Sequence, residues 1–314
     1  MCKRSVIWGL LISLSIFSSC KKNSSVVPLK DSTHPGTYML FAADETFNLG
    51  MSNAPSSYTS IYYCKLDGSG ITAVTSLDPG YYSYRASWSP DGTKVVFTRG
   101  NADDSYRALC ITSVPGGNFT VITRGHQVDY GSISPDGKKV AYAKSTIDSL
   151  YNYDVYIANI NGSNEQRLTY FGDDGGAVMN LQWGSDYKIY FNAAGQHHPE
   201  GIYNIDTTGL KLNSLVPGVD FLGLSHDGKK ILYDLSYGLF TCNVDGTNVK
   251  KIFNFDNNTP NSLLGASWAA DDSEIYSSYT DYPNGLFGIY RMNSDGTGVQ
   301  VKILPGFYEY PVVH

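Results

Sequence analysis

The sequence predicts an all-β protein: a six-bladed β-propeller with four antiparallel strands in each blade. Three observations support this fold class. Two kinds of hairpin alternate along the chain, a pair of them spans about 45 residues, and the two end segments are complementary parts of one blade. A single four-stranded sheet cannot bury both of its faces, so we expect the repeated sheets to pack around a common axis.

The first kind of hairpin is centred on a tight turn, as in SWSPDGTKVVF (87–97) and SISPDGKKVAY (132–142). In this turn Pro presets φ at the second position, Asp suits the third, and Gly tolerates the exit geometry. Variants of the hairpin follow at GLSHDGKKILY (223–233) and SWAADDSEIYS (267–277). These segments are expected to form the two inner strands of each blade.

The second kind of hairpin has alternating apolar residues on both sides of a Gly-containing turn. It occurs six times, at 61–75, 108–123, 155–169, 202–216, 239–253 and 289–303. These segments are expected to form the two outer strands of each blade.

The two ends of the repeat region predict how the ring closes. TYMLFAA (37–43) resembles a second strand without its innermost strand, and FYEYPVVH (307–314) resembles an innermost strand without its second strand. The C-terminal strand should therefore join the first blade. Residues 37–314 then form six blades with nothing left over.

The innermost strands share a further regularity. Aligning the repeats on the turn brings six apolar residues to one position: Trp88, Ile133, Trp183, Leu224, Trp268 and Val313. Tryptophan occurs in every second blade with a smaller side chain between. Alternating large and small residues pack well around a ring, so we expect these side chains to fill the seams between blades.

The hairpins SWSPDGTKVVF and SISPDGKKVAY resemble the WD40-like (PD40) repeat of the TolB-type six-bladed propellers, as does IYRMNSDGTG (289–298). The resemblance covers nearly all of residues 37–314. It implies the fold but not the activity, because the family includes binding scaffolds, propeller parts of peptidases and some polysaccharide lyases. TolB itself has an additional N-terminal α/β domain where this chain is expected to have only a short tether, so TolB's partner contacts cannot be transferred.

The N-terminus reads as a targeting segment. Lys3 and Arg4 precede the apolar run VIWGLLISLSIF, which is too short to span a bilayer. The run ends in FSSC, which resembles a bacterial lipobox, although Phe17 stands where Leu is more common. We therefore expect residues 1–19 to be a lipoprotein signal peptide and residues 20–36 a flexible tether with a lipidated Cys20. An ordinary secretory signal is the alternative.

Composition limits the partners. The formal net charge of −6 does not favour nucleic acid. With an anchor at Cys20, the protein would sit in the cell envelope, attached to the outer membrane by lipid alone, and it is expected to be a monomer. The remaining cysteines, Cys64, Cys110 and Cys242, show no CxxC spacing and are expected to be buried small apolar side chains.

The expected strand order assigns the connections to two rims. The turns within each hairpin share one rim and are short, whereas the connections between hairpins share the other rim and include long segments such as 44–58 and 145–154. This second rim is predicted to be acidic and rich in Tyr, which is typical of interfaces. The predicted ligand-binding residues are Tyr84, Asp129, Tyr130, Tyr153, Asp154, Asp173, Asp174, His197, His198, Tyr237, Asp281, Tyr282, Tyr308, Glu309 and Tyr310.

These residues favour a non-catalytic scaffold that recognises a protein or peptide. A carbohydrate-binding propeller, or a carbohydrate-cleaving one similar to oligogalacturonate lyase, is the alternative. No catalytic residue and no cofactor are assigned, since GxSxG is absent and the histidines have no metal-ligand spacing. A bound Ca²⁺ or other cation on the acidic rim, for example at FGDDGG (171–176), is left open, although turn chemistry is the preferred interpretation of that segment.

Overall fold

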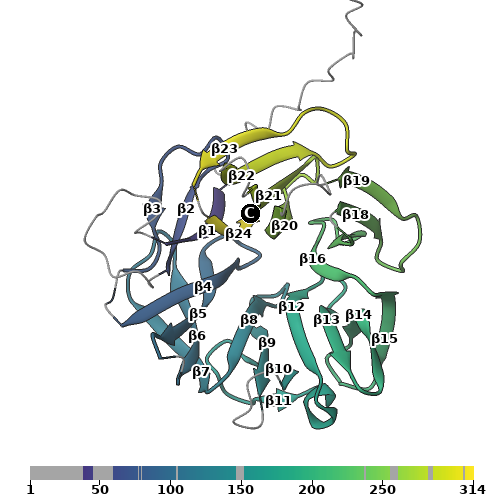
Figure 1. Ribbon diagram of the computed structural model, residues 1–314. Coiled ribbons are helices and arrows are strands. Elements are labelled where there is room, and N and C mark those ends of the chain that lie inside the picture. The colour runs from purple at the N-terminus through teal and green to yellow at the C-terminus, as the bar shows by residue number, and fades with distance from the viewer. Residues whose placement is uncertain are drawn as a thin grey trace, which may run out of the picture.

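The computed structural model describes most of the repeat region. The described residues are 38–44, 59–76, 78, 80–103, 105–145, 152–236, 238–254, 261–281, 286–306 and 308–314. They form six four-stranded antiparallel sheets arranged around a central axis, with one short 3₁₀ helix, η1 (Phe171–Asp174) (Figure 1). The predicted six-bladed propeller is confirmed.

The first three blades have the following strands, from the axis outward. Blade 1 contains β24 (Tyr308–Val313), β1 (Tyr38–Asp44), β2 (Thr59–Lys65) and β3 (Thr72–Ala73). Blade 2 contains β4 (Tyr81–Trp88), β5 (Lys94–Asn101), β6 (Arg107–Ser113) and β7 (Phe119–Gly125). Blade 3 contains β8 (Val128–Ile133), β9 (Lys139–Ser145), β10 (Tyr153–Asn159) and β11 (Gln166–Arg167).

The other three blades follow the same order. Blade 4 contains β12 (Ala177–Trp183), β13 (Ile189–Gly195), β14 (His198–Ile205) and β15 (Leu212–Pro217). Blade 5 contains β16 (Asp220–Leu224), β17 (Lys230–Asp234), β18 (Gly238–Asn243) and β19 (Lys250–Asn254). Blade 6 contains β20 (Asn261–Trp268), β21 (Glu274–Asp281), β22 (Leu286–Asn293) and β23 (Val301–Pro305).

The ring closes as predicted. β24 pairs antiparallel with β1, with Met39 opposite Val313 and Ala43 opposite Tyr308. The last strand of the chain thus becomes the innermost strand of the first blade, beside β20 and β4 (Figure 1).

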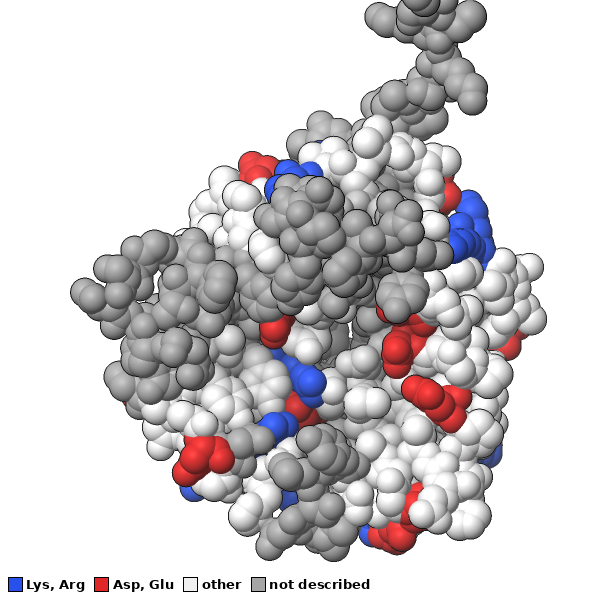
Figure 2. Space-filling model, in the orientation of Figure 1, with Lys and Arg blue, Asp and Glu red and all other residues white. Residues whose placement is uncertain are grey.

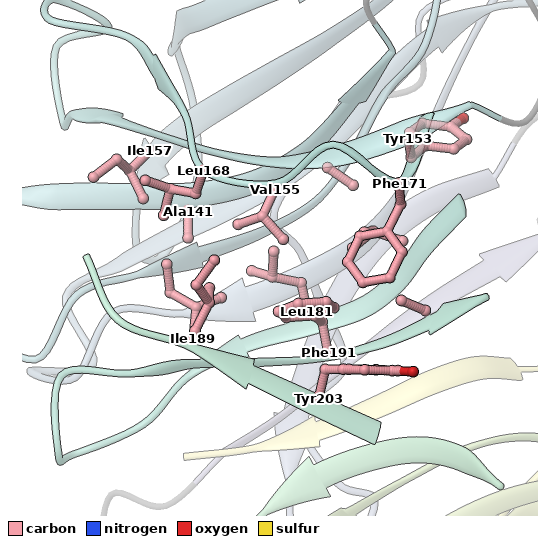
Figure 3. Packing of buried hydrophobic residues seen from close by; sticks show 14 of the residues in the cluster. Ala141, Tyr153, Val155, Ile157, Leu168, Phe171, Leu181, Ile189, Phe191 and Tyr203 are labelled. Carbon is pink, nitrogen blue, oxygen red and sulfur yellow. The ribbon is translucent and has the colours of Figure 1, made fainter. Parts of the chain in front are cut away.

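The hydrophobic core consists of six clusters, one at each seam between neighbouring blades. At the seam between blades 3 and 4, Val155 and Ile157 of β10 pack with Ile189 and Phe191 of β13 (Figure 3). The six aligned positions from Trp88 to Val313 supply one residue to each cluster. The prediction that they fill the seams is confirmed.

Hydrogen bonds join the innermost strands of neighbouring blades. Ser132 Oγ accepts the backbone N–H of Trp183 at 2.9 Å, and Ser267 Oγ accepts that of Val313 at 3.1 Å. Ser87 Oγ donates to the Gly131 carbonyl at 2.7 Å. These bonds satisfy polar groups that face the axis, and they hold the wall of the central channel together.

The turns inside the inner hairpins are closed by their own side chains. Asp91 Oδ1 accepts hydrogen bonds from Ser89 Oγ at 2.6 Å and from Thr93. These bonds to Ser89 and Thr93 lower the pKa of Asp91 to about 2. The same arrangement recurs at Ser134 with Asp136 and at Ser225 with Asp227, so the repeated SxDG motif is explained by turn closure.

No helix in the described part of the chain is long and apolar enough to cross a membrane.

Candidate functional site at the channel mouth

Every innermost strand has a β-bulge or irregularity in its register with the second strand, and the shifts lie within one residue of the same aligned position. Aligning the repeats brings six residues to this position: Arg85, Tyr130, Asn180, Phe221, Gly265 and Tyr310. A bulge bends its strand and re-aims side chains, and in this molecule it does so around one end of the central channel. We call Arg85, Tyr130, Asn180 and Tyr310 the bulge ring; all four line the channel.

The four residues of the bulge ring have left-handed backbone conformations, with φ of 50°, 56°, 47° and 51°, respectively. For side chains as large as Arg and Tyr this region is strained, at about 1–3 kcal/mol per residue. Glycine would remove that strain, yet only blade 6 has it at this position. Strain of this kind is concentrated at functional sites, where the side chain must point in a particular direction.

Arg85 lies between two tyrosine rings from the neighbouring blades. Its Cζ is 3.8 Å from the centroid of the Tyr130 ring and 5.6 Å from that of Tyr310. These distances are those of cation–π contacts, which stabilise a partly desolvated guanidinium. Blades 1, 2 and 3 therefore each contribute one residue to a stack at the mouth.

Asp129 anchors this stack from below. Its side chain is 1% exposed, and it accepts hydrogen bonds from Arg85 Nη1 at 2.7 Å and Arg107 Nη1 at 3.2 Å. Tyr84 Oη donates to it at 3.2 Å and Thr98 Oγ1 at 2.9 Å. The two guanidinium groups compensate the charge of the buried Asp129 carboxylate. The charges of the three side chains sum to +1.

Burial and neighbouring charges shift the pKa values of Arg85, Tyr84 and Tyr130 at the channel mouth. Burial would lower the pKa of Arg85, but the Asp129 carboxylate and the surrounding tyrosines raise it, so the guanidinium stays charged. Burial, followed by the nearby Asp129 charge, raises the pKa of Tyr84. Burial also raises the pKa of Tyr130. Tyr84 and Tyr130 are thus neutral hydrogen-bond donors.

The channel behind the mouth has a volume of about 390 Å³. Its wall includes three indoles, Trp88, Trp183 and Trp268, from alternate blades. Arg85 is the only Lys, Arg, Asp or Glu side chain among the described residues that line it. An aromatic cavity of this size with one fixed charge suits a small group that enters the ring, rather than a folded domain.

Five of the predicted ligand-binding residues gather at this mouth. They are Tyr84, Asp129, Tyr130, Tyr153 and Tyr310. Tyr153 Oη accepts a hydrogen bond from Arg107 Nη1 at 3.2 Å and donates to Gln127. The connection between Arg107 and Asp129 thus links Tyr153 to the stack.

Four other predicted residues lie together on the rim of blade 4. Asp173 contacts Arg167 Nη2 at 2.6 Å, and Asp174 Oδ2 lies 3.2 Å from Nδ1 of His197. The His198 ring packs on Phe171, with centroids 4.6 Å apart. This group is not part of the bulge ring.

Asp129 and Tyr153 are 1% and 7% exposed, and two further predicted residues are likewise buried in the scaffold. Asp154 is fully buried and accepts hydrogen bonds from Arg167, Thr169 and the backbone N–H of Gly172, so it holds η1 in place. Tyr308 is 5% exposed, with its ring 5.0 Å from that of Phe41 in the core. The structure therefore corrects their assignment to an accessible surface.

The remaining predictions are placed only in part. Glu309 is half-buried on β24, and Asp281 is the last residue of β21. Tyr237, Tyr282 and Cys20 lie outside the described residues.

The predicted acidic character of the rim holds only in part. In Figure 2, acidic side chains lie to the right of the central opening, over blades 4 and 5, and basic and acidic side chains lie side by side near the centre. Asp173, Glu200 and Asp220 are exposed on the acidic side. The mouth itself carries Arg85 and Arg107, which corrects the expectation of an acidic binding surface there.

Sequence reasoning missed Arg85, Asn180 and Arg107. The signal for the first two was present, since both lie three residues before a tryptophan of the aligned innermost strands. Nothing in the local sequence identifies Arg107, because its partner Asp129 is 22 residues away.

No group of three or more His, Cys, Asp or Glu side chains within the described ranges is placed to hold a metal ion. In the segment left open for a cation, Asp173 is paired with Arg167 and Asp174 with His197.

Comparison with solved structures shows which known proteins share this architecture. TolB from Acinetobacter baumannii superposes with a TM-score of 0.69 at 18% identity, covering 88% of this chain and 66% of that one. In fold, this chain is a TolB-like propeller. It spans just under two thirds of the length of that TolB. A putative TolB from Agrobacterium tumefaciens gives a TM-score of 0.58 at 16% identity, covering 86% of this chain and 90% of that one.

The TolB-like fold is shared with an enzyme. An oligogalacturonate lyase in complex with manganese gives a TM-score of 0.54 at 17% identity, covering 79% of this chain and 70% of that one. No family model and no curated protein matches the sequence. At these sequence identities the similarity establishes the fold alone, and the function has to be argued from the residues of the site.

Proposed function

We propose that this TolB-like propeller is a non-catalytic binding module that receives a segment of a protein or peptide at the mouth of its central channel. The observation that carries the proposal is the bulge ring. Four residues have left-handed conformations at equivalent positions, and the three that are strained, Arg85, Tyr130 and Tyr310, form one stacked group. The fold keeps side chains aimed at the channel at a cost in stability, which is expected of a recognition site.

The chemistry of the mouth supports recognition rather than catalysis. Tyr84, Tyr130 and Arg85 have raised pKa values, so none of them is poised to exchange a proton near neutral pH. Tyr and Arg are the side chains that supply binding energy at protein interfaces, because they combine large apolar area with hydrogen-bond donors.

A photocrosslinking experiment tests this proposal. p-Benzoylphenylalanine is introduced in the full chain in place of Asn180 at the mouth, or in place of Thr93 as a matched control. Thr93 is exposed in an inner-hairpin turn at the other end of the channel. After irradiation in an envelope extract, a discrete protein adduct is expected from position 180 and not from position 93.

Two outcomes count against the proposal. Equal adducts from both positions would indicate non-specific contact. Binding on a glycan array that Tyr130→Ala abolishes, without any protein adduct, would replace the proposal by the carbohydrate-binding alternative.

We also propose that the protein acts in the cell envelope, anchored through a lipid on Cys20. Metabolic labelling with a fatty-acid analogue is expected to mark the wild type and not Cys20→Ala. Labelling of both proteins, or of neither, contradicts the anchor and leaves the binding proposal standing.

A further inference from the structure

We infer that the group received at the mouth is a carboxylate attached to an apolar body, such as the C-terminal end of a peptide, and that Arg85 binds it. This inference rests on the proposed function and names the chemistry of its ligand.

The guanidinium of Arg85 is only partly used by the protein. Nη1 donates to Asp129 at 2.7 Å, whereas Nε is buried and has no acceptor. Arg85 makes no other hydrogen bond to the described residues. A buried donor without an acceptor is costly, and a carboxylate is the acceptor that matches the paired N–H groups of arginine.

Aromatic packing holds Arg85 in place before a ligand arrives. The Tyr130 ring covers one face of the guanidinium, and the Tyr310 ring lies near it at a longer distance. An immobilised arginine loses little further entropy on binding, which favours a specific contact.

The charge at the mouth suits a single negative charge. Arg85 and Arg107 carry two positive charges, and Asp129 between them carries one negative charge. The charges of these three side chains sum to +1, which matches a carboxylate better than a phosphate dianion or a polyuronate.

The wall of the channel suits an apolar body better than a sugar. Several of its polar side chains already make hydrogen bonds between blades. Ser132 and Ser267 accept backbone N–H groups, and Gln182 Oε1 accepts the Leu224 N–H at 2.8 Å. A sugar needs many free hydrogen-bond partners, whereas the wall behind Arg85 also includes partly exposed apolar side chains such as Trp88, Leu222 and Val312. The side-chain amide of Asn180 makes no hydrogen bond to the described residues. It is therefore available to form hydrogen bonds with the backbone of a bound peptide.

The test compares N-acetyl-L-phenylalanine with N-acetyl-L-phenylalaninamide, using tryptophan fluorescence of the full chain as the readout, since three of its tryptophans line the channel. The acid is expected to bind at least about tenfold more tightly than the amide, because the amide cannot form a charge-assisted hydrogen bond. Equal binding of the two, or no binding of the acid up to its solubility, overturns the inference. Tighter binding of inorganic phosphate or galacturonate also overturns it.

Matched variants locate the contact. Arg85→Gln is expected to weaken binding of the acid about tenfold or more and to leave the amide unchanged. Arg124→Gln removes the same charge from the exposed outer strand of blade 2 and should change neither. If Arg85→Gln does not fold, Arg85→Lys serves instead: it keeps the charge and loses the paired donors, so partial loss supports the contact and full retention contradicts it.

The crosslinking experiment separates this inference from the proposed function. A protein adduct at position 180 that the acid does not compete away leaves the binding module standing and overturns the carboxylate. Binding of the acid through Arg85 without any protein adduct supports the carboxylate site and contradicts the protein-binding function.

Discussion

Two seams of this propeller are built to the same plan and differ in charge. At the seam between blades 2 and 3, Thr98 Oγ1 donates to Asp129 at 2.9 Å. At the seam between blades 4 and 5, Asn192 Nδ2 donates to Asp220 at 3.1 Å. Asp129 and Asp220 each lie four residues before the seam-filling residue of their innermost strand. We call these two contacts the seam clasps.

The surroundings of the two clasps are opposite. Asp129 is buried beneath Arg85 and Arg107, whereas Asp220 is exposed and lies opposite Asp234 in the pairing of β16 with β17. Burial, followed by the charge of Asp220, raises the pKa of Asp234. The comparison teaches that the same contact can join two seams while the side chains around it give each seam a different charge. Under the proposed function, this difference makes the seam between blades 2 and 3 the one that binds.

The largest expected difference follows from removing the two carboxylates. Asp129→Ala leaves two partly buried guanidinium groups without their shared partner and should lower the free energy of unfolding by about 3–5 kcal/mol. Asp220→Ala removes an exposed charge beside Asp234 and should change the free energy of unfolding by less than about 1 kcal/mol. Urea denaturation of both variants measures the difference, and similar losses would show that the two seams are alike.

A smaller effect is expected from the clasps themselves. Thr98→Val keeps the shape of the side chain and removes one donor to Asp129, for about 1–2 kcal/mol. Asn192→Ala also frees the backbone N–H of Phe221, which Asn192 accepts at 2.9 Å, and should cost about 1–3 kcal/mol. Comparable losses in urea denaturation would confirm a shared structural role, whereas a neutral Thr98→Val would show that the arginines alone hold Asp129.

The smallest effect is expected at Asp234, where it depends on pH. Because the pKa of Asp234 is raised in the folded state, its ionised form destabilises the protein, and the protein gains stability as pH falls through the raised value. Asp234→Asn should therefore stabilise by less than about 1 kcal/mol at pH 7, with the difference vanishing below about pH 4.

Asp91 is the control for this pH dependence, since its pKa is lowered to about 2. Its contribution is present above the unfolded value and is lost as pH falls toward 2. Asp91→Asn should thus destabilise at neutral pH, opposite in sign to Asp234→Asn. Thermal melts across the pH range distinguish the two, and a stabilising Asp91→Asn would contradict this assignment.

The fold was predictable because its signals are local. Turn residues such as Asp91 and Gly92, and the alternation of apolar side chains beside them, specify each hairpin without reference to the rest of the chain. Closure was predictable because the segments 37–43 and 307–314 each lacked what the other supplied.

The site was predictable only where residue type was informative. Tyr130 and Tyr310 were identified because tyrosine on a loop rim is typical of recognition surfaces. Arg85 was not, since its role depends on a backbone bulge and on Asp129, which lies 44 residues further along the chain. Tyr308 was misassigned for a related reason: its burial depends on Phe41, at the other end of the repeat region.

The closing strand has a consequence for when the protein becomes competent. β24 supplies Tyr310, so a polypeptide interrupted after β23 would contain five complete sheets and still lack one wall of the recognition stack. Under the proposed function, a polypeptide that lacks β24 would not assemble the complete stack around Arg85 and would bind its ligand poorly.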